Sequence, residues 1–511
     1  MKTKFTLRIV TVTILGCLTF SSLASENETF TLPDGTILNL SGVSESLEQW
    51  KKELESYIEQ AKLGDAKAQY MLGLHYQDGL FISQNCSEAI KWIGKAVDQD
   101  YGEAQYSLGM DYEAGRCVDK NYIKAKEMYL KAAKNGFPAA YFDAAMLYEN
   151  GYVDEKDHTD VIKLVTLAAN GGYVVAQTYL GKVYEDENNY LQAFQWYLKA
   201  AEKGYGEAQY YIAVLYDQGK GFPKNSLKAL DWYKKSADAG YAEAQYYLGE
   251  CYYLGKGVQK DLNQAFNLYE KAAYSDLPKA QCRLGELYEQ GLGVEQDYSL
   301  ALRWYKDAAN HGDAKAQFNL ANLYYFGNGV PKDISEAFKW FRKGAEQGHP
   351  ESQVCLAVCY TNGTGVEQNY SEALKWLEKA AIQGDVLGQK YLGHFYYTGK
   401  GVEKNYSEAM KWHRKAAEQG DAEAQVLVGE YYFFRMGGKR SKSEATKWYR
   451  KAADQGNVTA LHYMGKAYLN GWGIRQNTEE AKRYFGLGCD KGDDLSCYWY
   501  AKLNKQGSEY Q

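Results

Sequence analysis

Residues 241–276 read YAEAQYYLGECYYLGKGVQKDLNQAFNLYEKAAYSD, and this stretch decides the fold because variants of it follow one another along most of the chain. Each copy contains a Gln, or a residue that replaces it, which anchors the alignment. The anchors stand at 69, 105, 141, 177, 209, 245, 281, 317, 353, 389, 425, 461 and 497, so the period is 36 residues with one shorter interval of 32. The sequence therefore predicts twelve full repeats over residues 65–492 and a C-terminal half-repeat that acts as a cap over residues 493–511.

Each repeat predicts two helices joined by a glycine-containing turn. In the repeat quoted above, Leu248, Gly249 and Tyr252 follow the anchor at helical spacing and mark a first helix, called helix A. Gly255 is placed to end that helix, and Asp261 is placed to cap the second, called helix B. Both apolar stripes are too short to be stable alone, so neighbouring repeats must cover them. We expect an all-α fold, an αα-superhelix (α-solenoid) of about twelve 36-residue helix-turn-helix repeats.

Strictly periodic aromatic residues predict how the repeats pack. A Tyr stands seven residues past the anchor in all twelve full repeats, and a Trp recurs in helix B of eight of them. We interpret both as packing residues, so replacing Tyr252 or Tyr324 by Ala should open a cavity at a cost of about 3 kcal/mol. Small Ala and Gly residues between the aromatic positions let the two helices approach closely.

The N-terminus has the pattern of a secretory signal. Basic residues precede an apolar stretch from Ile9 to Phe20, and small residues precede a cleavage point after Ala24. We therefore expect a signal peptide at 1–24 and a periplasmic or secreted protein. The residues before Cys17 resemble a bacterial lipobox, which leaves a lipid anchor at that cysteine as the alternative.

Two short segments separate the signal peptide from the repeats. Residues 25–43 alternate apolar and polar side chains around Pro33-Asp34-Gly35, which is typical of a small β-hairpin. Residues 44–64 are predicted to form an N-terminal capping helix, because the stretch from Trp50 to Ala61 looks like a helix B without its helix A.

Charge and hydropathy narrow the class of partner. The formal net charge of −6 disfavours non-specific binding of nucleic acid. After the signal segment, no stretch approaches the roughly 20 apolar residues of a membrane span. We expect a protein partner, no nucleic acid, no membrane span and a monomeric chain.

Neither a catalytic centre nor a metal site is indicated by the His and Cys residues. The seven His are dispersed over several repeats, and the sequence contains no His-Glu-x-x-His and no Cys-x-x-Cys. His394 and His413 share one repeat, and we interpret both as solvent-facing or packed. The acidic stretch 154–160 lacks the Gly and the terminal Glu of an EF-hand loop. We expect no catalytic residue, no metal ligand and no cofactor.

Three recurring motifs carry a family resemblance. Ala-Gln-Tyr-x-Leu-Gly-x-x-Tyr, Gly-x-Gly-Val-x-Lys-Asn-Tyr-x-x-Ala and Trp-x-x-Lys-Ala-Ala-x-x-Gly resemble the Sel1-like repeat family, a relative of tetratricopeptide repeats, over nearly all of the chain after residue 64. The resemblance implies a superhelix that binds protein partners. It also implies a role like those of bacterial members of the family. These members act as periplasmic adaptors, as envelope regulators or as exported factors that bind host proteins such as immunoglobulin.

The cysteines are expected to form at least one disulfide after export. Residues 489–497 resemble the cysteine-rich branch of the same family, in which paired cysteines join a helix B to the following helix A. The turn at Gly492 also allows the Cβ atoms of Cys489 and Cys497 to come within about 4 Å, so we expect these two to be bonded. Weaker candidates are Cys86 with Cys117 and Cys251 with Cys282, whereas Cys355 and Cys359 lie one turn apart on a single helix and should not bond.

Some cysteine-rich relatives have been regarded as penicillin binders, so a penicillin-binding or peptidoglycan hydrolase is the enzyme hypothesis to exclude. That chemistry needs a Ser-x-x-Lys turn and a Lys-Thr-Gly strand. Neither motif occurs in the sequence.

A partner would sit on the variable positions of helix A, which usually lines the concave face of such superhelices. Positions two, five and nine past the anchor lie on one side of that helix, and we call them the groove positions. Aromatic residues and Arg dominate protein interfaces. The residues expected to bind a partner are Tyr211, Tyr247, Arg283, Phe326, Tyr391, Glu250, Glu286 and His394. The alternative is that these tyrosines merely pack on neighbouring helices A.

The sequence as a whole favours a non-enzymatic protein-protein interaction scaffold, in the bacterial envelope or secreted, that binds a partner in a concave Tyr-rich groove. A host-interaction factor is the alternative, because it would need the same groove and the same export signal. An envelope hydrolase is the third hypothesis.

Overall fold

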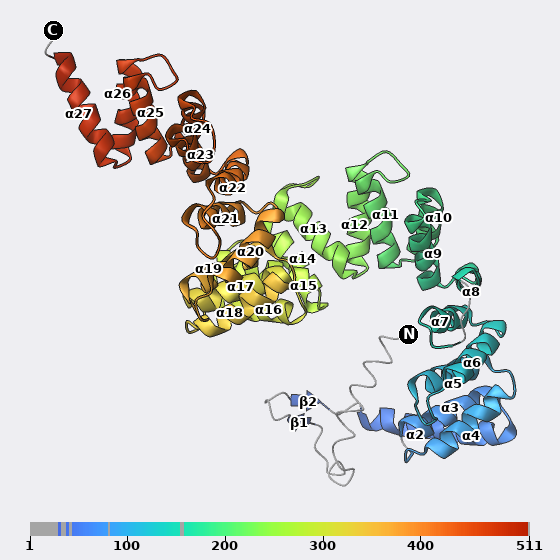
Figure 1. Ribbon diagram of the computed structural model, residues 1–511. Coiled ribbons are helices and arrows are strands. Elements are labelled where there is room, and N and C mark those ends of the chain that lie inside the picture. The colour runs from blue at the N-terminus through green and yellow to red at the C-terminus, as the bar shows by residue number, and fades with distance from the viewer. Residues whose placement is uncertain (1–28, 32–36, 40–42, 80–81, 154–157, 509–511) are drawn as a thin grey trace. The chain divides into compact units, whose positions relative to one another are not determined.

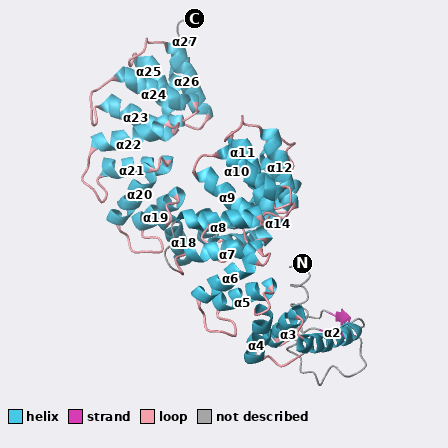
Figure 2. Ribbon diagram, turned by 90° about the vertical axis from the view of Figure 1, so that its right-hand side faces the viewer, coloured by secondary structure: helices cyan, strands magenta, loops and turns pink. Residues whose placement is uncertain are grey.

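Twelve pairs of helices follow one another along the chain, each pair consisting of a helix A and a helix B (Figure 1). They belong to a computed structural model that describes residues 29–31, 37–39, 43–79, 82–153 and 158–508. Figure 2 shows loops joining successive helices throughout the described chain. The expected all-α solenoid of helix-turn-helix repeats is confirmed.

The helices A are α3 (Ala66–Asp78), α5 (Gly102–Ala114), α7 (Pro138–Glu149), α9 (Val174–Asp186), α11 (Gly206–Gln218), α13 (Ala242–Leu254), α15 (Pro278–Gln290), α17 (Ala314–Phe326), α19 (Pro350–Asn362), α21 (Val386–Thr398), α23 (Ala422–Phe434) and α25 (Val458–Asn470). The helices B are α4 (Cys86–Val97), α6 (Tyr122–Lys134), α8 (His158–Asn170), α10 (Tyr190–Ala201), α12 (Ser226–Asp238), α14 (Leu262–Tyr274), α16 (Tyr298–Asn310), α18 (Ile334–Glu346), α20 (Tyr370–Ile382), α22 (Tyr406–Glu418), α24 (Lys442–Asp454) and α26 (Thr478–Asp490).

Further elements flank the repeats. The strands β1 (Thr29–Thr31) and β2 (Ile37–Asn39) pair antiparallel, with Phe30 opposite Leu38. Helix α2 (Val43–Leu63) precedes the first repeat and α27 (Asp494–Ser508) follows the last. The expected signal peptide, the alternative anchor at Cys17 and residues 154–157 of the acidic stretch lie outside the described residues.

The helix ends follow from glycine and capping residues at fixed places in each repeat. Gly255 adopts φ 71° after α13, and its N–H donates to the carbonyl of Cys251. Asp261 accepts hydrogen bonds from the N–H groups of Asn263 and Gln264 and so caps α14. The N–H of Asp261 also donates to the carbonyl of Tyr252 (3.0 Å), which fixes the turn between the two helices.

The two helices of a repeat meet at a small residue. Gly249, four residues past the anchor, faces the ring of Tyr269, and a Cβ atom built at Gly249 would lie 2.7 Å from a ring carbon. Tyr269 is fully buried, and its hydroxyl donates to Glu250 (2.7 Å). Because the glycine has no side chain, α13 and α14 come close enough to bury the whole ring. We call such a pair a seam pair.

Seam pairs recur in both helices of the other repeats. The glycine pairs are Gly73 with Ile93, Gly109 with Tyr129, Gly181 with Tyr197, Gly285 with Tyr305, Gly393 with His413, Gly429 with Tyr449 and Gly465 with Phe485. An Ala replaces the Gly in four repeats, at Ala145, Ala213, Ala321 and Ala357. Three of these share a buried cluster with a helix B residue, in Ala145 with Val165, Ala321 with Phe341 and Ala357 with Leu377. The expected close approach of helices at small residues is therefore present.

The largest buried side chains come from a different position than the sequence suggested. The twelve periodic tyrosines, including Tyr252 and Tyr324, are half-buried. They pack at the edge of clusters whose centres are seam residues such as Tyr269 and Tyr305, both 0% exposed. The expected packing role of the periodic tyrosines therefore agrees with these contacts, whereas the expected cost of about 3 kcal/mol for Tyr252→Ala stays a prediction.

The anchor glutamines tie each helix A to its surroundings. Gln317 is buried, and its Nε2 donates to the carbonyl of Ala309 at the end of the preceding helix B (3.1 Å). Its Oε1 accepts a hydrogen bond from Gln347 in the turn after α18 (2.8 Å). The anchor thus hydrogen-bonds to the backbone of the preceding helix B and to a side chain in the turn after its own helix B. These two hydrogen bonds explain why a Gln recurs at this position.

The described chain forms two compact units, and the boundary falls within the sequence of α11. The first contains the residues up to Leu215 together with Lys220–Phe222, and the second contains Tyr216–Gly219 and the residues from Pro223 onward. No helix among the described residues is both long and apolar enough to cross a membrane.

Candidate partner-binding face

Aromatic rings at position two past the anchor are partly exposed on helix A. Tyr247 and Tyr391 are each 39% exposed. Tyr247 stacks on Tyr233 with ring centroids 5.7 Å apart, and the Lys279 ammonium lies 5.0 Å from the centroid of Tyr247. Tyr211 is more enclosed, because it stacks on Tyr197 at 5.2 Å. Thus Tyr247 and Tyr391 offer ring surface, whereas much of Tyr211 already packs against the preceding repeat.

Arg283, Glu250 and Glu286 are brought together in one ion-pair network between α13 and α15. The Arg283 guanidinium donates to both carboxylate oxygens of Glu250 (2.9 and 3.2 Å) and to Glu286 (2.6 Å). Burial disfavours the charge of Arg283, but the two carboxylates outweigh it and raise the Arg283 pKa. The side chains of all three are less than a quarter exposed. Their first task is therefore to join consecutive helices A.

The same link recurs where position five is a Glu. Asn319 Nδ2 lies 3.5 Å from Glu286 Oε1, and the Tyr463 hydroxyl donates to Glu430 (2.9 Å). In each case the residue at position two of one helix A reaches position five of the helix A before it. Lys315 adds an ion pair to Glu286 (2.5 Å). Position five is thus largely engaged within the stack, and the sequence alone did not reveal this use.

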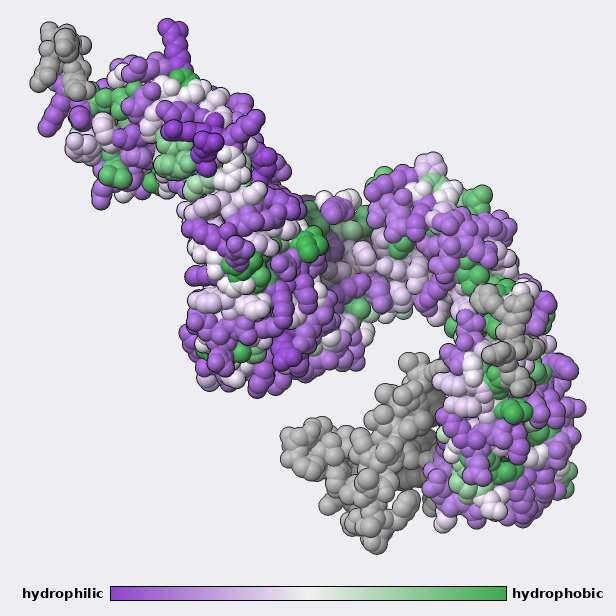
Figure 3. Space-filling model, in the orientation of Figure 1, coloured by the Kyte–Doolittle hydropathy of each residue, from purple (hydrophilic) through white to green (hydrophobic). Residues whose placement is uncertain are grey.

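Position nine carries the most exposed apolar side chains of the face. Leu254, Phe326 and Phe434 are 49%, 65% and 57% exposed. Phe326 contacts Tyr325 edge-on, with centroids 5.1 Å apart. In Figure 3 the hydrophobic areas on the visible face are small and separate within a mostly hydrophilic surface.

His394 and His413 differ in environment. His394 is exposed, and its pKa is lowered by partial burial and by Lys400. His413 is 1% exposed, its Nε2 lies 3.1 Å from the Lys390 carbonyl and its Nδ1 lies 3.0 Å from the Tyr431 hydroxyl. Burial lowers the pKa of His413 to about 4, so it is neutral at pH 7.

Two features of the described residues bear on whether they could form a metal site or an enclosed pocket. No group of three or more His, Cys, Asp or Glu side chains there could hold a metal ion. A shallow depression is lined by Ser407, Met410, Lys411, Arg414, Lys415 and Glu418, all from α22. This depression is therefore formed by one face of a single helix and is not an enclosed pocket.

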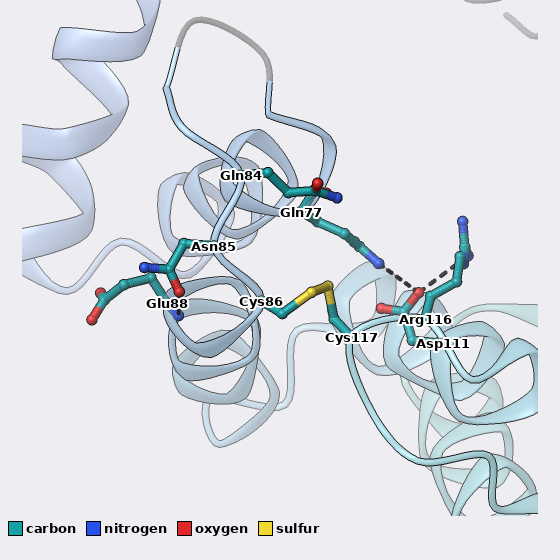
Figure 4. Close-up of a disulfide and its surroundings, with 8 residues drawn as sticks. All are labelled: Gln77, Gln84, Asn85, Cys86, Glu88, Asp111, Arg116 and Cys117. Carbon is teal, nitrogen blue, oxygen red and sulfur yellow. Dashed lines mark hydrogen bonds and ion pairs between the residues drawn. A yellow bond between two sulfur atoms is a disulfide. The ribbon is translucent and has the colours of Figure 1, made fainter.

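A disulfide joins Cys86, the first residue of α4, to Cys117 in the turn after α5 (Figure 4). Most repeats hold a glycine at the place of Cys117, and a Cβ built at one of them, Gly293, would lie 2.7 Å from the carbonyl oxygen of Leu262 at the start of the preceding helix B. Gly329, Gly365 and Gly401 approach the preceding helix B in the same way. Here the Cα atoms are 4.9 Å apart, and the two cysteines fill the gap with a bond.

A buried acid lies beside this disulfide. Asp111 is 0% exposed, accepts a hydrogen bond from Gln77 (2.8 Å) and pairs with Arg116 (3.1 Å), as Figure 4 shows. Burial raises the pKa of Asp111, although Gln77 and Arg116 oppose that shift. The hydrogen bond from Gln77 to Asp111 connects α3 to α5 across the repeat boundary.

The second disulfide is the expected one, between Cys489 and Cys497, and it joins α26 to α27. Cys251, Cys282, Cys355 and Cys359 are free thiols. Burial raises the pKa of Cys355 to about 12 and that of Cys359 to about 11, so neither is a reactive thiolate at pH 7. Of the two weaker pairs predicted from the sequence, one is bonded and the other is not.

A family model described as Sel1 repeat matches twelve consecutive segments of the chain. The segments are 66–101, 102–137, 138–173, 174–205, 206–241, 242–277, 278–313, 314–349, 350–385, 386–421, 422–457 and 458–493. No curated protein matches the sequence.

The solved structures that are similar to the chain include those of two bacterial proteins. The first is a protective antigen present in uropathogenic Escherichia coli strains that displays an SLR fold; it is 33% identical, with 89% of this chain and 94% of the antigen covered and a TM-score of 0.64. The second is a Sel1 repeat protein from Oxalobacter formigenes, 36% identical over 48% of this chain and 96% of that protein, with a TM-score of 0.43.

Proposed function

Since the chain belongs to the Sel1 repeat family, we propose that it is a non-enzymatic scaffold that binds a partner protein on its helix A face. The observation that carries the proposal is the exposure of large rings at the groove positions. Tyr247, Phe326, Tyr391 and Phe434 are each more than a third exposed. Rigid aromatic side chains supply contact area at low entropic cost and are enriched among interface hot spots.

The proposal assigns different roles to the residues of the face. The exposed rings of Tyr247, Phe326 and Tyr391 contact the partner directly. His394, which is exposed one helical turn beyond Tyr391, adds a polar contact. Arg283, Glu250 and Glu286 hold consecutive helices A in register and act on the partner through their remaining exposed edges.

We further propose that the protein works in the bacterial envelope or outside the cell. The two disulfides support an oxidising compartment, because such bonds persist mainly there. A host-facing role is the second candidate, and the similarity to a protective antigen of uropathogenic Escherichia coli favours it.

The test is co-purification of the exported protein with envelope extract and, in parallel, with host secretions. The double variant Phe326→Ala/Tyr391→Ala should lose the partner that the wild type retains. Ile382→Ala is the matched control, because Ile382 is 76% exposed but lies at the end of a helix B. Equal retention by wild type, double variant and control would place the binding surface elsewhere.

A further inference from the structure

The turn between α23 and α24 is rich in basic residues. It carries Arg435, Lys439 and Arg440, and α24 begins with Lys442. All four are exposed. From residue 435 to 451 the chain has seven basic side chains and one acidic one, although the whole chain has a net charge of −6. The acid, Glu444, is already paired with Lys447 (2.7 Å).

Backbone strain marks the same turn. Arg435 adopts φ 63° and ψ 36°, the left-handed conformation that Gly255, Gly327 and Gly399 adopt at the same place. A side chain there costs free energy that glycine would not. Strain that persists at a surface position points to a use for the side chain, and the Arg435 guanidinium pairs with no acidic group among the described residues.

The next turn extends the positive surface. Trp472, between α25 and α26, packs on Phe433 with centroids 4.6 Å apart, and its carbonyl accepts a hydrogen bond from the Thr446 hydroxyl (2.5 Å). The two turns are therefore in contact. Arg475 stands in this second turn and is exposed. Together with the 57% exposed ring of Phe434, these residues form what we call the basic edge: Phe434, Arg435, Lys439, Lys442 and Arg475.

The charge at one position of the turns reverses along the array. Fourteen residues past the anchor, earlier repeats carry Glu295, Glu367 and Glu403, whereas the last two carry Lys439 and Arg475. All five side chains are exposed. A broad anionic surface laid along the turns would also meet Glu295 and Glu367, whose turns contain no Lys or Arg, and like charges would repel it there. A narrow acidic ligand can reach the basic edge alone.

From these observations we propose that the basic edge binds an acidic segment of a partner protein. Guanidinium groups beside an exposed ring suit carboxylates flanked by apolar side chains. The inference rests on the proposed protein-binding function, but it names a surface at the turns instead of the helix A face. In Figure 2 these turns project from the helices of the C-terminal part of the chain.

The experiment measures binding of a fluorescein-labelled peptide of repeated Glu-Asp-Tyr units to the full exported protein by fluorescence anisotropy at low salt. Lys439→Glu/Arg475→Glu introduces the residue that neighbouring repeats already use, so the fold should be retained. The dissociation constant should rise at least about fivefold, and added salt should abolish the difference. Lys260→Glu/Lys332→Glu, with the same change in net charge on two other turns, should change it less than about twofold.

Arg435→Gly supplies a second variant that cannot fail by misfolding, because glycine is the residue that other repeats use there. It should weaken peptide binding about twofold while leaving the melting temperature unchanged or higher.

Three results would overturn the proposal: no loss of binding in the double variant, an equal loss in the control, or binding of phosphatidylglycerol vesicles that depends on Lys439 and Arg475 while the peptide does not bind. The Phe326→Ala/Tyr391→Ala variant should bind the peptide like the wild type. Failure of this proposal and failure of the proposed function are therefore separate outcomes.

Discussion

The seam and the helix A face use the same residue types for different ends. In one repeat, Tyr269 is 0% exposed against Gly249, whereas Tyr247, on the same α13, is 39% exposed. The seam depends on contact inside a repeat, so its loss removes packing that nothing replaces. The helix A face depends on side-chain surface that remains exposed. Arg283 shows that a variable residue on this face can still stabilise the stacking of repeats, because it pairs with Glu250 of the preceding helix A. Variation between repeats therefore does not by itself identify a binding residue.

The largest expected effect is at the seam. Tyr269→Ala should lower the free energy of unfolding by about 3 to 5 kcal/mol, because it removes a fully buried ring and leaves the space against Gly249 empty. Tyr252→Ala, at the half-buried position, should cost clearly less. Urea denaturation of both variants, followed by circular dichroism, measures the difference. If Tyr252→Ala were the more damaging, the seam would not be the main source of stability.

Tyr269→Phe separates the ring from its hydroxyl. It removes only the hydrogen bond to Glu250 and should cost about 1 kcal/mol. A cost as large as that of Tyr269→Ala would mean that the polar link, not the packed ring, dominates this seam pair.

The second largest effect concerns pH at the one seam pair that contains a histidine. The folded-state pKa of His413 is about 4, below the ordinary value of 6.5, because burial disfavours the charged ring. An unfolded chain binds the proton first, so stability is complete above pH 6.5 and is lost as pH falls toward 4. The loss should reach about 3 kcal/mol.

His413→Tyr tests this assignment, since Tyr fills the same position in several other repeats. The urea midpoint of the wild type should fall more steeply between pH 7 and pH 4.5 than that of the variant. Parallel pH curves for the two proteins would show that His413 does not control the acid sensitivity.

A smaller effect is expected where the face and the stack overlap. Arg283→Ala should destabilise by about 1 to 2 kcal/mol, since it leaves Glu250 and Glu286 close together without their shared cation. Tyr247→Ala should cost less than half as much. Denaturation at low and high salt is the measurement, and the Arg283→Ala deficit should shrink with salt. If the Arg283 variant were as stable as the wild type, Arg283 would not stabilise the stack, and partner binding would be its only proposed role.

The sequence predicted the helices, turns and repeat boundaries because each depends on local residue chemistry. Gly255 and Asp261, for example, end and begin helices through contacts within a few residues. The seam position was missed because it holds Tyr in some repeats and other types, such as Ile93 and Leu377, in the rest, so no residue is strictly periodic there. Only burial matters there, whereas the strictly periodic Tyr252 position attracted attention although it is half-buried.

The cysteines and the face show the same limit. Cys86 with Cys117 and Cys251 with Cys282 have equal spacing in sequence, yet only the first pair occupies a close approach between a turn and the preceding helix B. Likewise, residues at positions two and five were grouped by helical spacing, but the link from Arg283 to Glu250 joins different repeats. Contacts across a repeat boundary require the stacking geometry, which spacing within one helix does not contain.

The smallest effect on stability, and the sharpest test of the comparison, is at Phe326. The ring is 65% exposed at the end of α17, so Phe326→Ala should change the free energy of unfolding by no more than about 0.5 kcal/mol. The same variant should weaken binding of the partner by about 1 to 2 kcal/mol if the ring inserts into it. Thermal melting and titration calorimetry with the co-purified partner give the two numbers, and Ile382→Ala should change neither. A Phe326→Ala variant with a melting temperature as low as that of Tyr269→Ala would contradict the distinction between seam and face. A variant that keeps full affinity would leave the rings at position two and the basic edge as the surfaces that bind the partner.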